Sequence, residues 1–85
     1  MEEKVGVVTD YLNRIGVAVI SLTDGDLRVG DRVRIAGRET DLTQTVESLQ
    51  IEHQAVEQAL RGSEVAIKVQ DRVRRHDQVF RVRNG

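Results

Sequence analysis

The stretch DGDLRVGDRVRI, residues 24–35, decides how the chain is interpreted, because it is the one segment that looks like a phosphate-binding loop. Its glycines, Gly25 and Gly30, have the spacing of the loop G-x-x-x-x-G-K-[ST]. In that loop the lysine neutralises phosphate charge and the hydroxyl group holds magnesium. Here Asp31 and Arg32 occupy those two positions, and an aspartate would repel a phosphate. We therefore expect no nucleotide site in this stretch.

The same stretch is better explained as a turn that leads into a strand. Glycine and aspartate are favoured turn residues, so Gly30 and Asp31 predict a tight turn, with Leu27 and Val29 facing inward. Apolar and charged residues then alternate over residues 32–35, which is typical of a half-buried strand. A strand here also argues against the phosphate loop, which needs a helix at this place.

Short segments of strand character recur along the rest of the chain. We expect strands over residues 4–12, 15–22, 43–52, 64–69 and 78–83, in addition to 32–35. Residues 15–22 are apolar on both faces, and a slip of parity within 43–52 predicts a β-bulge near Ser48. Residues 53–62 show the one helical pattern, with Gly62 where a helix would end. Six short strands and at most one short helical turn predict an all-β fold, an antiparallel barrel or a sandwich.

The composition bounds the size and the class of the protein. Its 85 residues suffice for one small domain, which we assign to residues 1–85. The core has to be aliphatic, because Tyr11 and Phe80 are the only aromatic residues. Cysteine is absent, which excludes disulfides and thiolate metal sites and indicates the cytoplasm. The start MEEKVGVV has no signal-peptide pattern, and no apolar run is long enough to span a membrane.

Positive charge is concentrated near the C-terminus, although the net charge is −1. Residues 1–67 carry seven basic and twelve acidic side chains, whereas residues 68–85 carry six basic and two acidic ones. These six cations are the candidate nucleic-acid-binding residues: Lys68, Arg72, Arg74, Arg75, Arg81 and Arg83. Arginine suits phosphates, but the same side chains could pair with carboxylates on a solvated sheet face. The acidic remainder and the scarcity of aromatic residues for base stacking limit the expected RNA contact to a weak, salt-sensitive one.

No pattern in the chain predicts catalysis or a cofactor. His53 and His76 are far apart in sequence, and no cysteine can join them at a metal. The serines lie in no signature such as G-x-S-x-G. Acidic pairs such as Asp24 and Asp26 lie in turns, where water keeps them ordinary acids. We therefore expect no catalytic residue, no metal and no cofactor, and we predict that the protein is not an enzyme.

Three short motifs occur in an order that is typical of one family. They are L-x-V-G-D at residues 27–31, V-x-S-L-Q at 46–50 and A-x-x-G-x-x-V-A at 59–66. With them the chain resembles the second domain of translational GTPases, such as elongation factor Tu and initiation factor two, over residues 5–82. The resemblance implies a small closed six-stranded Greek-key barrel, in which the glycine and aspartate of the first motif form a turn. It excludes a GTPase, since the family binds nucleotide in a separate preceding domain.

The resemblance also implies partners and marks two departures from the family. There the barrel contacts the GTPase domain, ribosomal RNA and, in elongation factor Tu, the aminoacylated end of transfer RNA. Elongation factor Tu has an asparagine in its amino-acid pocket at the position of Glu64, and a buried carboxylate would change or abolish that recognition. His76 replaces the usual glycine before the last strand, so the turn is expected to differ. Similar barrels also occur as accessory domains at the end of collagenase-like peptidases, where the catalytic residues lie elsewhere.

Two functions follow from the sequence and the resemblance. The first is a non-catalytic, translation-factor-like binding module of the cytoplasm. It would contact ribosomal or transfer RNA, or a ribonucleoprotein, through the arginine-rich loop 70–77 and the last strands. The alternative is a protein-interaction or accessory barrel that docks on a separately encoded enzyme or GTPase partner. Neither function involves a membrane or a bound nucleotide.

Overall fold

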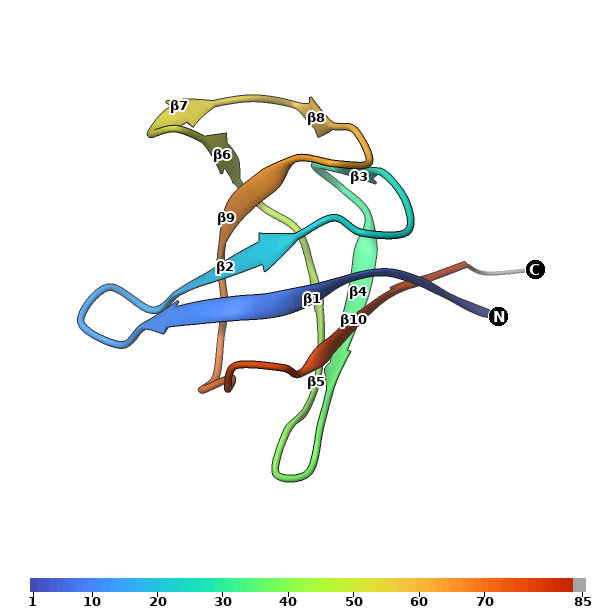
Figure 1. Ribbon diagram of the computed structural model, residues 1–85, viewed down its shortest axis with the longest axis vertical. Helices are drawn as coiled ribbons and strands as arrows, with labels where there is room; N and C mark the ends of the chain where they lie inside the picture. The colour runs from blue at the N-terminus through green and yellow to red at the C-terminus, as the bar shows by residue number, and fades with distance from the viewer. Residues whose placement is uncertain (84–85) are drawn as a thin grey trace.

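The computed structural model describes residues 1–83 of the chain. These residues form ten β-strands and no helix, so the predicted all-β class is confirmed (Figure 1). The strands are β1 (Glu2–Leu12), β2 (Val17–Ser21), β3 (Leu27–Arg28), β4 (Arg32–Ala36), β5 (Asp41–Thr45), β6 (Leu49–Ile51), β7 (Gln54–Ala55), β8 (Gln58–Ala59), β9 (Glu64–Lys68) and β10 (Gln78–Val82). Within the described residues there is accordingly no helix of the length and apolar character that crossing a membrane requires.

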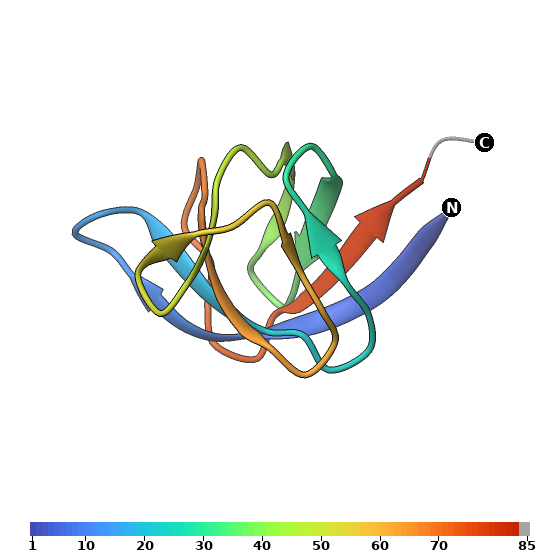
Figure 2. The same ribbon diagram turned by 90° about the horizontal axis from the view of Figure 1, so that it is seen from above.

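The long strand β1 organises the main sheet, because it pairs with β10 along its first half and with β2 along its second. The sheet runs in the order β5-β4-β10-β1-β2-β9-β6-β7, and β3 and β8 form a separate pair. The register of β1 shifts against β10 between Lys4 and Gly6, and against β2 between Val8 and Asp10. Bulges bend the strand that carries them, and the sheet curls around the core (Figure 2). These bulges explain why the valines of β1 alternate imperfectly with polar residues in the sequence.

The curled sheet is not closed into a barrel. Its terminal strands, β5 and β7, share no ladder within residues 1–83, so the predicted closed six-stranded Greek-key barrel is wrong. A side chain spans part of the opening instead. Buried Gln44 of β5 donates from Nε2 to the Lys68 carbonyl at 2.8 Å, and its Oε1 accepts from the Gln70 N–H at 2.8 Å. One glutamine thus links β5 to the end of β9, where a closed barrel would use a backbone ladder.

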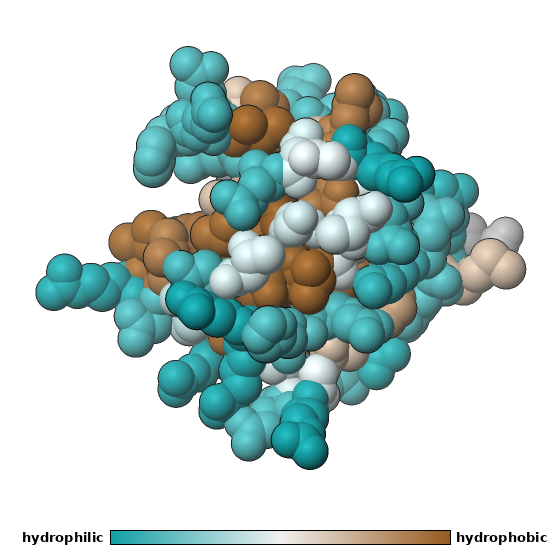
Figure 3. Space-filling view, viewed as in Figure 1, coloured by the Kyte–Doolittle hydropathy of each residue, from teal (hydrophilic) through white to brown (hydrophobic). Residues whose placement is uncertain are grey.

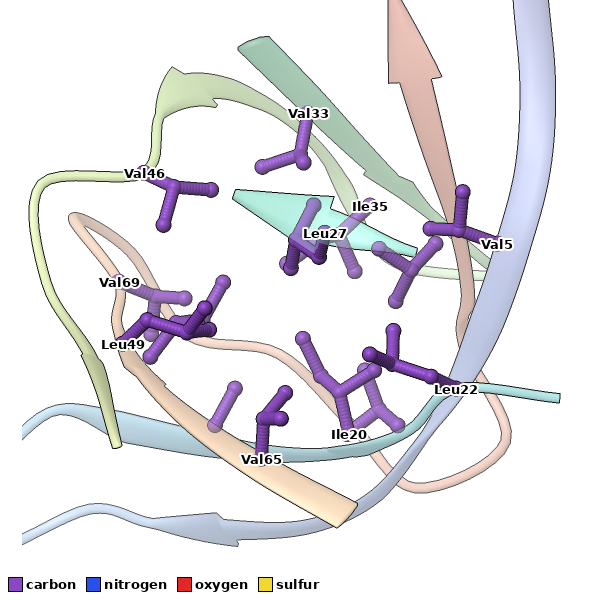
Figure 4. Packing of buried hydrophobic residues seen from close by; sticks show 14 of the residues in the cluster. Val5, Ile20, Leu22, Leu27, Val33, Ile35, Val46, Leu49, Val65 and Val69 are labelled. Atoms are coloured by element: carbon purple, nitrogen blue, oxygen red, sulfur yellow. The ribbon is translucent and has the colours of Figure 1, made fainter. Parts of the chain in front are cut away.

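The core is aliphatic, as the composition required. One cluster of buried Val, Leu, Ile and Ala side chains fills the inside of the curled sheet, and Figure 4 shows them pointing toward one another from opposite walls. Val33 and Ile35 of β4 are buried in it, as the alternation predicted. Tyr11 packs against the cluster from its margin, and Phe80 is half-buried. Such a core is held by many small contacts rather than by large aromatic ones.

The stretch between β3 and β4 forms the turn that its glycine and aspartate predicted. Gly30 has a φ of 96°, and the Asp31 N–H donates to the Arg28 carbonyl at 3.1 Å. The Asp31 carboxylate in turn accepts from the Arg28 N–H at 2.9 Å. A positive φ at the third turn position is where glycine is favoured. Leu27 is buried as expected, but Val29 is 41% exposed at the corner of the turn, so its predicted inward orientation is wrong.

Residues 53–62 form strands rather than the predicted helical turn. β7 pairs with β6 across a two-residue loop, and β8 pairs with β3. Ala59 is buried whereas Leu60 is 60% exposed, so the apolar residues of this segment do not form one buried helical face. A helix of two turns is marginal in water, and pairing with neighbouring strands satisfies backbone groups that such a helix would leave open.

Two further departures from the prediction change where residues lie in the fold. The segment 43–52 is interrupted at residues 46–48, so the chain leaves the sheet near Ser48 instead of bulging within one strand. β2 begins only at Val17, because the Gly16 N–H donates to the Leu12 carbonyl at 2.9 Å and closes a hairpin loop. Ile15 therefore lies in this loop, not in a strand, and is 61% exposed.

Candidate functional site

An open groove, which we call the apolar groove, lies between the β1–β2 hairpin and the β6–β7 turn, with β9 at its base. Its volume is about 520 Å³. Its lining includes apolar side chains from the hairpin and β6, and polar side chains from the β6–β7 loop and β9: Leu12, Ile15, Val17, Ile51, Glu52, His53 and Glu64. The space-filling view shows the apolar surface over the hairpin and the hollow between it and the lobe of β6 and β7 (Figure 3).

The apolar groove exists because β2 is apolar on both of its faces. Ala18 and Ile20 point into the core, while Val17 and Val19 are half-buried on the other face and line the groove. A sheet face that meets only water normally alternates with polar residues. The doubly apolar pattern of this strand was therefore the sequence signal for the groove, and the sequence interpretation did not use it.

The mouth of the groove is polar and carries negative charge. Glu52 and Glu64 are both exposed there, and the described residues that line the groove include no Lys or Arg. Glu64 is therefore not the buried carboxylate that the resemblance to elongation factor Tu implied. Glu52 and His53 form the two-residue β6–β7 loop with φ values of 50° and 67°. Such loops favour Asn-Gly, and a left-handed conformation costs other residues about 1–2 kcal/mol each.

The second histidine lies in a different part of the fold, at the turn before β10. His76 has a φ of 75°, and its N–H donates to the Val8 carbonyl at 2.8 Å. The turn thus keeps the left-handed conformation that glycine favours, although the residue is histidine. Next to it, buried Asp77 accepts from the Arg74 N–H at 2.9 Å. Among residues 1–83 no three His, Asp or Glu side chains are grouped as metal ligands.

The six predicted nucleic-acid-binding cations are spread over three elements. Lys68 ends β9; Arg72, Arg74 and Arg75 lie on the following loop; Arg81 belongs to β10 and Arg83 follows it. Two of the loop arginines reach acids of other segments: Arg74 Nη2 lies 2.7 Å from the Glu39 carboxylate, and Arg75 Nη2 lies 3.5 Å from the Asp10 carboxylate. Exposed pairs of this kind contribute little to stability.

The cation of the last strand, Arg81, and the one that follows it, Arg83, are paired as well. The Arg81 side chain is only 16% exposed, forms an ion pair with Glu3, and approaches Asp31 at 3.8 Å and the Asp26 carbonyl at 3.3 Å. Arg83 Nη2 lies 3.6 Å from the same Glu3 carboxylate. The structure thus brings four of the six cations to carboxylates, which was the alternative that the charge pattern left open. Nucleic-acid binding by the six stays a prediction.

Curated proteins similar to this chain are named as proteases. A collagenase of Porphyromonas gingivalis is 37% identical over 78 residues, which make up 91% of this chain and 22% of that protein. The uncharacterized protease MJ0090 of Methanocaldococcus jannaschii is 36% identical over 78 residues, 91% of this chain and 19% of that protein. The chain therefore spans about a fifth of the length of the curated relatives it matches. No protein-family model matches the chain.

Two solved structures with a similar fold are of the C-terminal domain of a Geobacillus thermoleovorans protein. The C-terminal domain of a Geobacillus thermoleovorans protein described as a U32 peptidase has a TM-score of 0.87 at 24% identity, covering 95% of this chain and 93% of that one. Its selenomethionine variant has a TM-score of 0.85 at 25% identity, covering 91% and 96%. The fold described above therefore accounts for nearly the whole of the solved Geobacillus chain.

These findings correct the family and the function that the sequence predicted. The relatives are named collagenase and protease, so the assignment to the second domain of translational GTPases is wrong. The translation-factor-like RNA-binding module and its alternative, a barrel docked on a separate enzyme or GTPase, are wrong with it. The same names contradict the prediction that the protein is not an enzyme.

Two of the three motifs reflect turns of the backbone rather than a function. Gly30 and Gly62, the glycines of the first and third motifs, both have a φ of 96°. A glycine is favoured wherever the backbone has to adopt such a conformation. The motifs therefore specify a backbone path, and the same path serves proteins of different function.

Proposed function

We propose that this chain is a C-terminal domain of the U32 peptidase kind, and that it serves peptide hydrolysis by holding a polypeptide substrate. The observation that carries the proposal is the 37% identity to a collagenase over 91% of the chain. The likeness of the whole fold to the C-terminal domain of a U32 peptidase supports the same assignment. A share in substrate binding fits the apolar groove, because apolar side chains on a rigid sheet are a common means of recognising polypeptides.

We also propose that residues 1–85 form one domain that folds independently. The solved neighbour supports this, since 93% of its chain is covered by the fold described above. The two ends of the described chain lie side by side, with the Arg83 N–H donating to the Met1 carbonyl at 2.8 Å (Figures 1 and 2). Adjacent ends allow a domain to be exchanged between proteins with little disturbance. The cytoplasmic location stays a prediction, which fractionation of the source cells would test.

A domain exchange tests the proposed function. The 78 matching residues of the Porphyromonas gingivalis collagenase are replaced by the matching part of this chain, and hydrolysis of gelatin is measured. The collagenase lacking those residues, and the collagenase carrying an unrelated β domain of similar size, are the controls. We expect this chain to restore hydrolysis that both controls lack. If the exchanged protein is folded but no more active than the control with the unrelated domain, the proposal is refuted.

A further inference from the structure

Two large aliphatic side chains in the apolar groove are exposed to solvent. Leu12 and Ile15 are 40% and 61% exposed, and neither belongs to the core cluster or packs against it. Both come from one hairpin and line one groove, so they are neighbours on a surface rather than isolated exposed residues. Neighbouring apolar side chains that the fold leaves exposed are a candidate site of interaction.

The charge of the groove restricts what could cover that surface. Two carboxylates, Glu52 and Glu64, flank the apolar residues, and no described cation joins them in the lining. Anionic lipid headgroups and nucleic-acid phosphates would be repelled by these carboxylates. A lysine or arginine side chain would be attracted, and its apolar stem could lie along the groove.

The backbone at the mouth of the groove is held in an unfavourable conformation. Glu52 and His53 both have positive φ values in a loop where Asn-Gly would be free of strain. Non-glycine residues in such conformations persist only where the surrounding structure holds them, and they are enriched at active sites and binding sites. The strained loop and the exposed aliphatic residues therefore line the same groove.

We infer that the apolar groove binds an extended polypeptide segment in which an apolar side chain lies next to a lysine or arginine. The apolar side chain packs on Leu12 and Ile15, and the cation pairs with Glu52 or Glu64. The inference rests on the proposed function, since it takes a polypeptide as the ligand, and it names the place and the chemistry of binding. The groove volume of about 520 Å³ is within the range of sites that bind small ligands and short segments.

Fluorescence anisotropy with three labelled unfolded peptides tests the inference. The first peptide repeats Leu-Lys and Leu-Arg pairs separated by glycine, the second has glutamate in place of each cation, and the third has serine in place of each leucine. We expect saturable binding of the first peptide that weakens with salt, and at least about tenfold weaker binding of the other two.

Matched variants locate the site on the protein. Ile15→Ser should weaken binding of the first peptide about tenfold, whereas Leu60→Ser, which removes an apolar residue of equal exposure (60% against 61%) outside the groove, should leave it unchanged. Glu52→Gln and Glu64→Gln should each weaken it about threefold, with exposed Glu57→Gln as the control. All five positions are on the surface, so circular dichroism should show folded variants.

Several results would overturn the inference. They are equal binding of the three peptides, equal losses in the groove and control variants, binding of anionic vesicles in place of peptide, or a dimer whose formation buries the groove and excludes peptide. The proposed function and the groove inference can be refuted independently of each other. An active domain exchange without peptide binding refutes the groove alone, and specific peptide binding with an inactive exchange refutes the assignment to a peptidase.

Discussion

Replacing Gln44 by alanine should loosen the attachment of β5 to the end of β9. Gln44 is 4% exposed, and its amide makes the two 2.8 Å hydrogen bonds to the backbone of Lys68 and Gln70. Among residues 1–83 no backbone ladder joins β5 to β9, so these two hydrogen bonds link the strands through a side chain. Alanine removes both hydrogen bonds and leaves a C=O and an N–H group without partners.

The expected loss of stability follows from these two bonds. A hydrogen bond inside a protein contributes about 0.5–1.5 kcal/mol net, so two of them contribute about 1–3 kcal/mol. A loss at the upper end of this range would require that water does not reach the unpaired Lys68 carbonyl and Gln70 N–H. A polar cleft of about 450 Å³ adjoins Gln44, Lys68 and Gln70, so water can reach them. We therefore expect a loss of about 2 kcal/mol, which for a domain of this size lowers the Tm by about 8–16 °C.

Urea unfolding followed by circular dichroism measures the loss, and amide hydrogen exchange measures where it occurs. The Gln70 amide should lose protection before the amides of the central strands. Gln44→Leu keeps most of the volume but neither hydrogen bond, so it should be destabilised to a similar extent. Gln54→Ala, on the exposed edge strand β7, is the control and should change stability by less than about 0.5 kcal/mol. A loss below about 0.5 kcal/mol in Gln44→Ala, or an unchanged Gln70 amide, would refute the role assigned to this side chain.

Three further perturbations test the turn, a bulge and a surface pair. His76→Gly should raise stability by about 1 kcal/mol in urea unfolding, since it relieves the φ of 75°; an unchanged or lower midpoint contradicts this. Gly6→Ala should destabilise by at least about 2 kcal/mol, because its Cβ would lie 2.2 Å from the Ser21 carbonyl oxygen; a Tm close to that of the unchanged protein speaks against it. The Arg34 Nε lies 2.9 Å from the Asp41 carboxylate, and this guanidinium holds the pKa of the Asp41 carboxyl below its ordinary 3.8. The pair therefore stabilises the fold above pH 3.8, and this stabilisation is lost as the pH falls through the lowered pKa. NMR titration should show the low Asp41 pKa and its return toward 3.8 in Arg34→Gln; equal values in the two proteins would contradict the assignment.

Local features of this chain were predictable because they depend on residues that are neighbours in sequence. The alternation over residues 32–35 predicted β4, and its two apolar residues are buried as expected. Glycine and aspartate predicted the turn between β3 and β4, since backbone conformation there is a property of those two residues. The aliphatic core follows from composition alone. Residues 53–62 show where prediction from local pattern fails. The spacing of their apolar residues suits a helix, but pairing with β3 and β6 makes them strands.

The amino-acid sequence by itself determined the all-β class, most strand positions and the kind of core, since each is a matter of pattern and side-chain chemistry over a few residues. Tertiary structure alone decided that the sheet stays open with Gln44 bridging to Lys68, 24 residues away, and that Arg75 lies beside Asp10, 65 residues away. It also placed the β1–β2 hairpin and β6 along one groove, the apolar groove. Hydrogen bonds, ion pairs and grooves between distant segments depend on how all the strands curl together around the core, and the pattern within one segment does not specify which distant residues then meet.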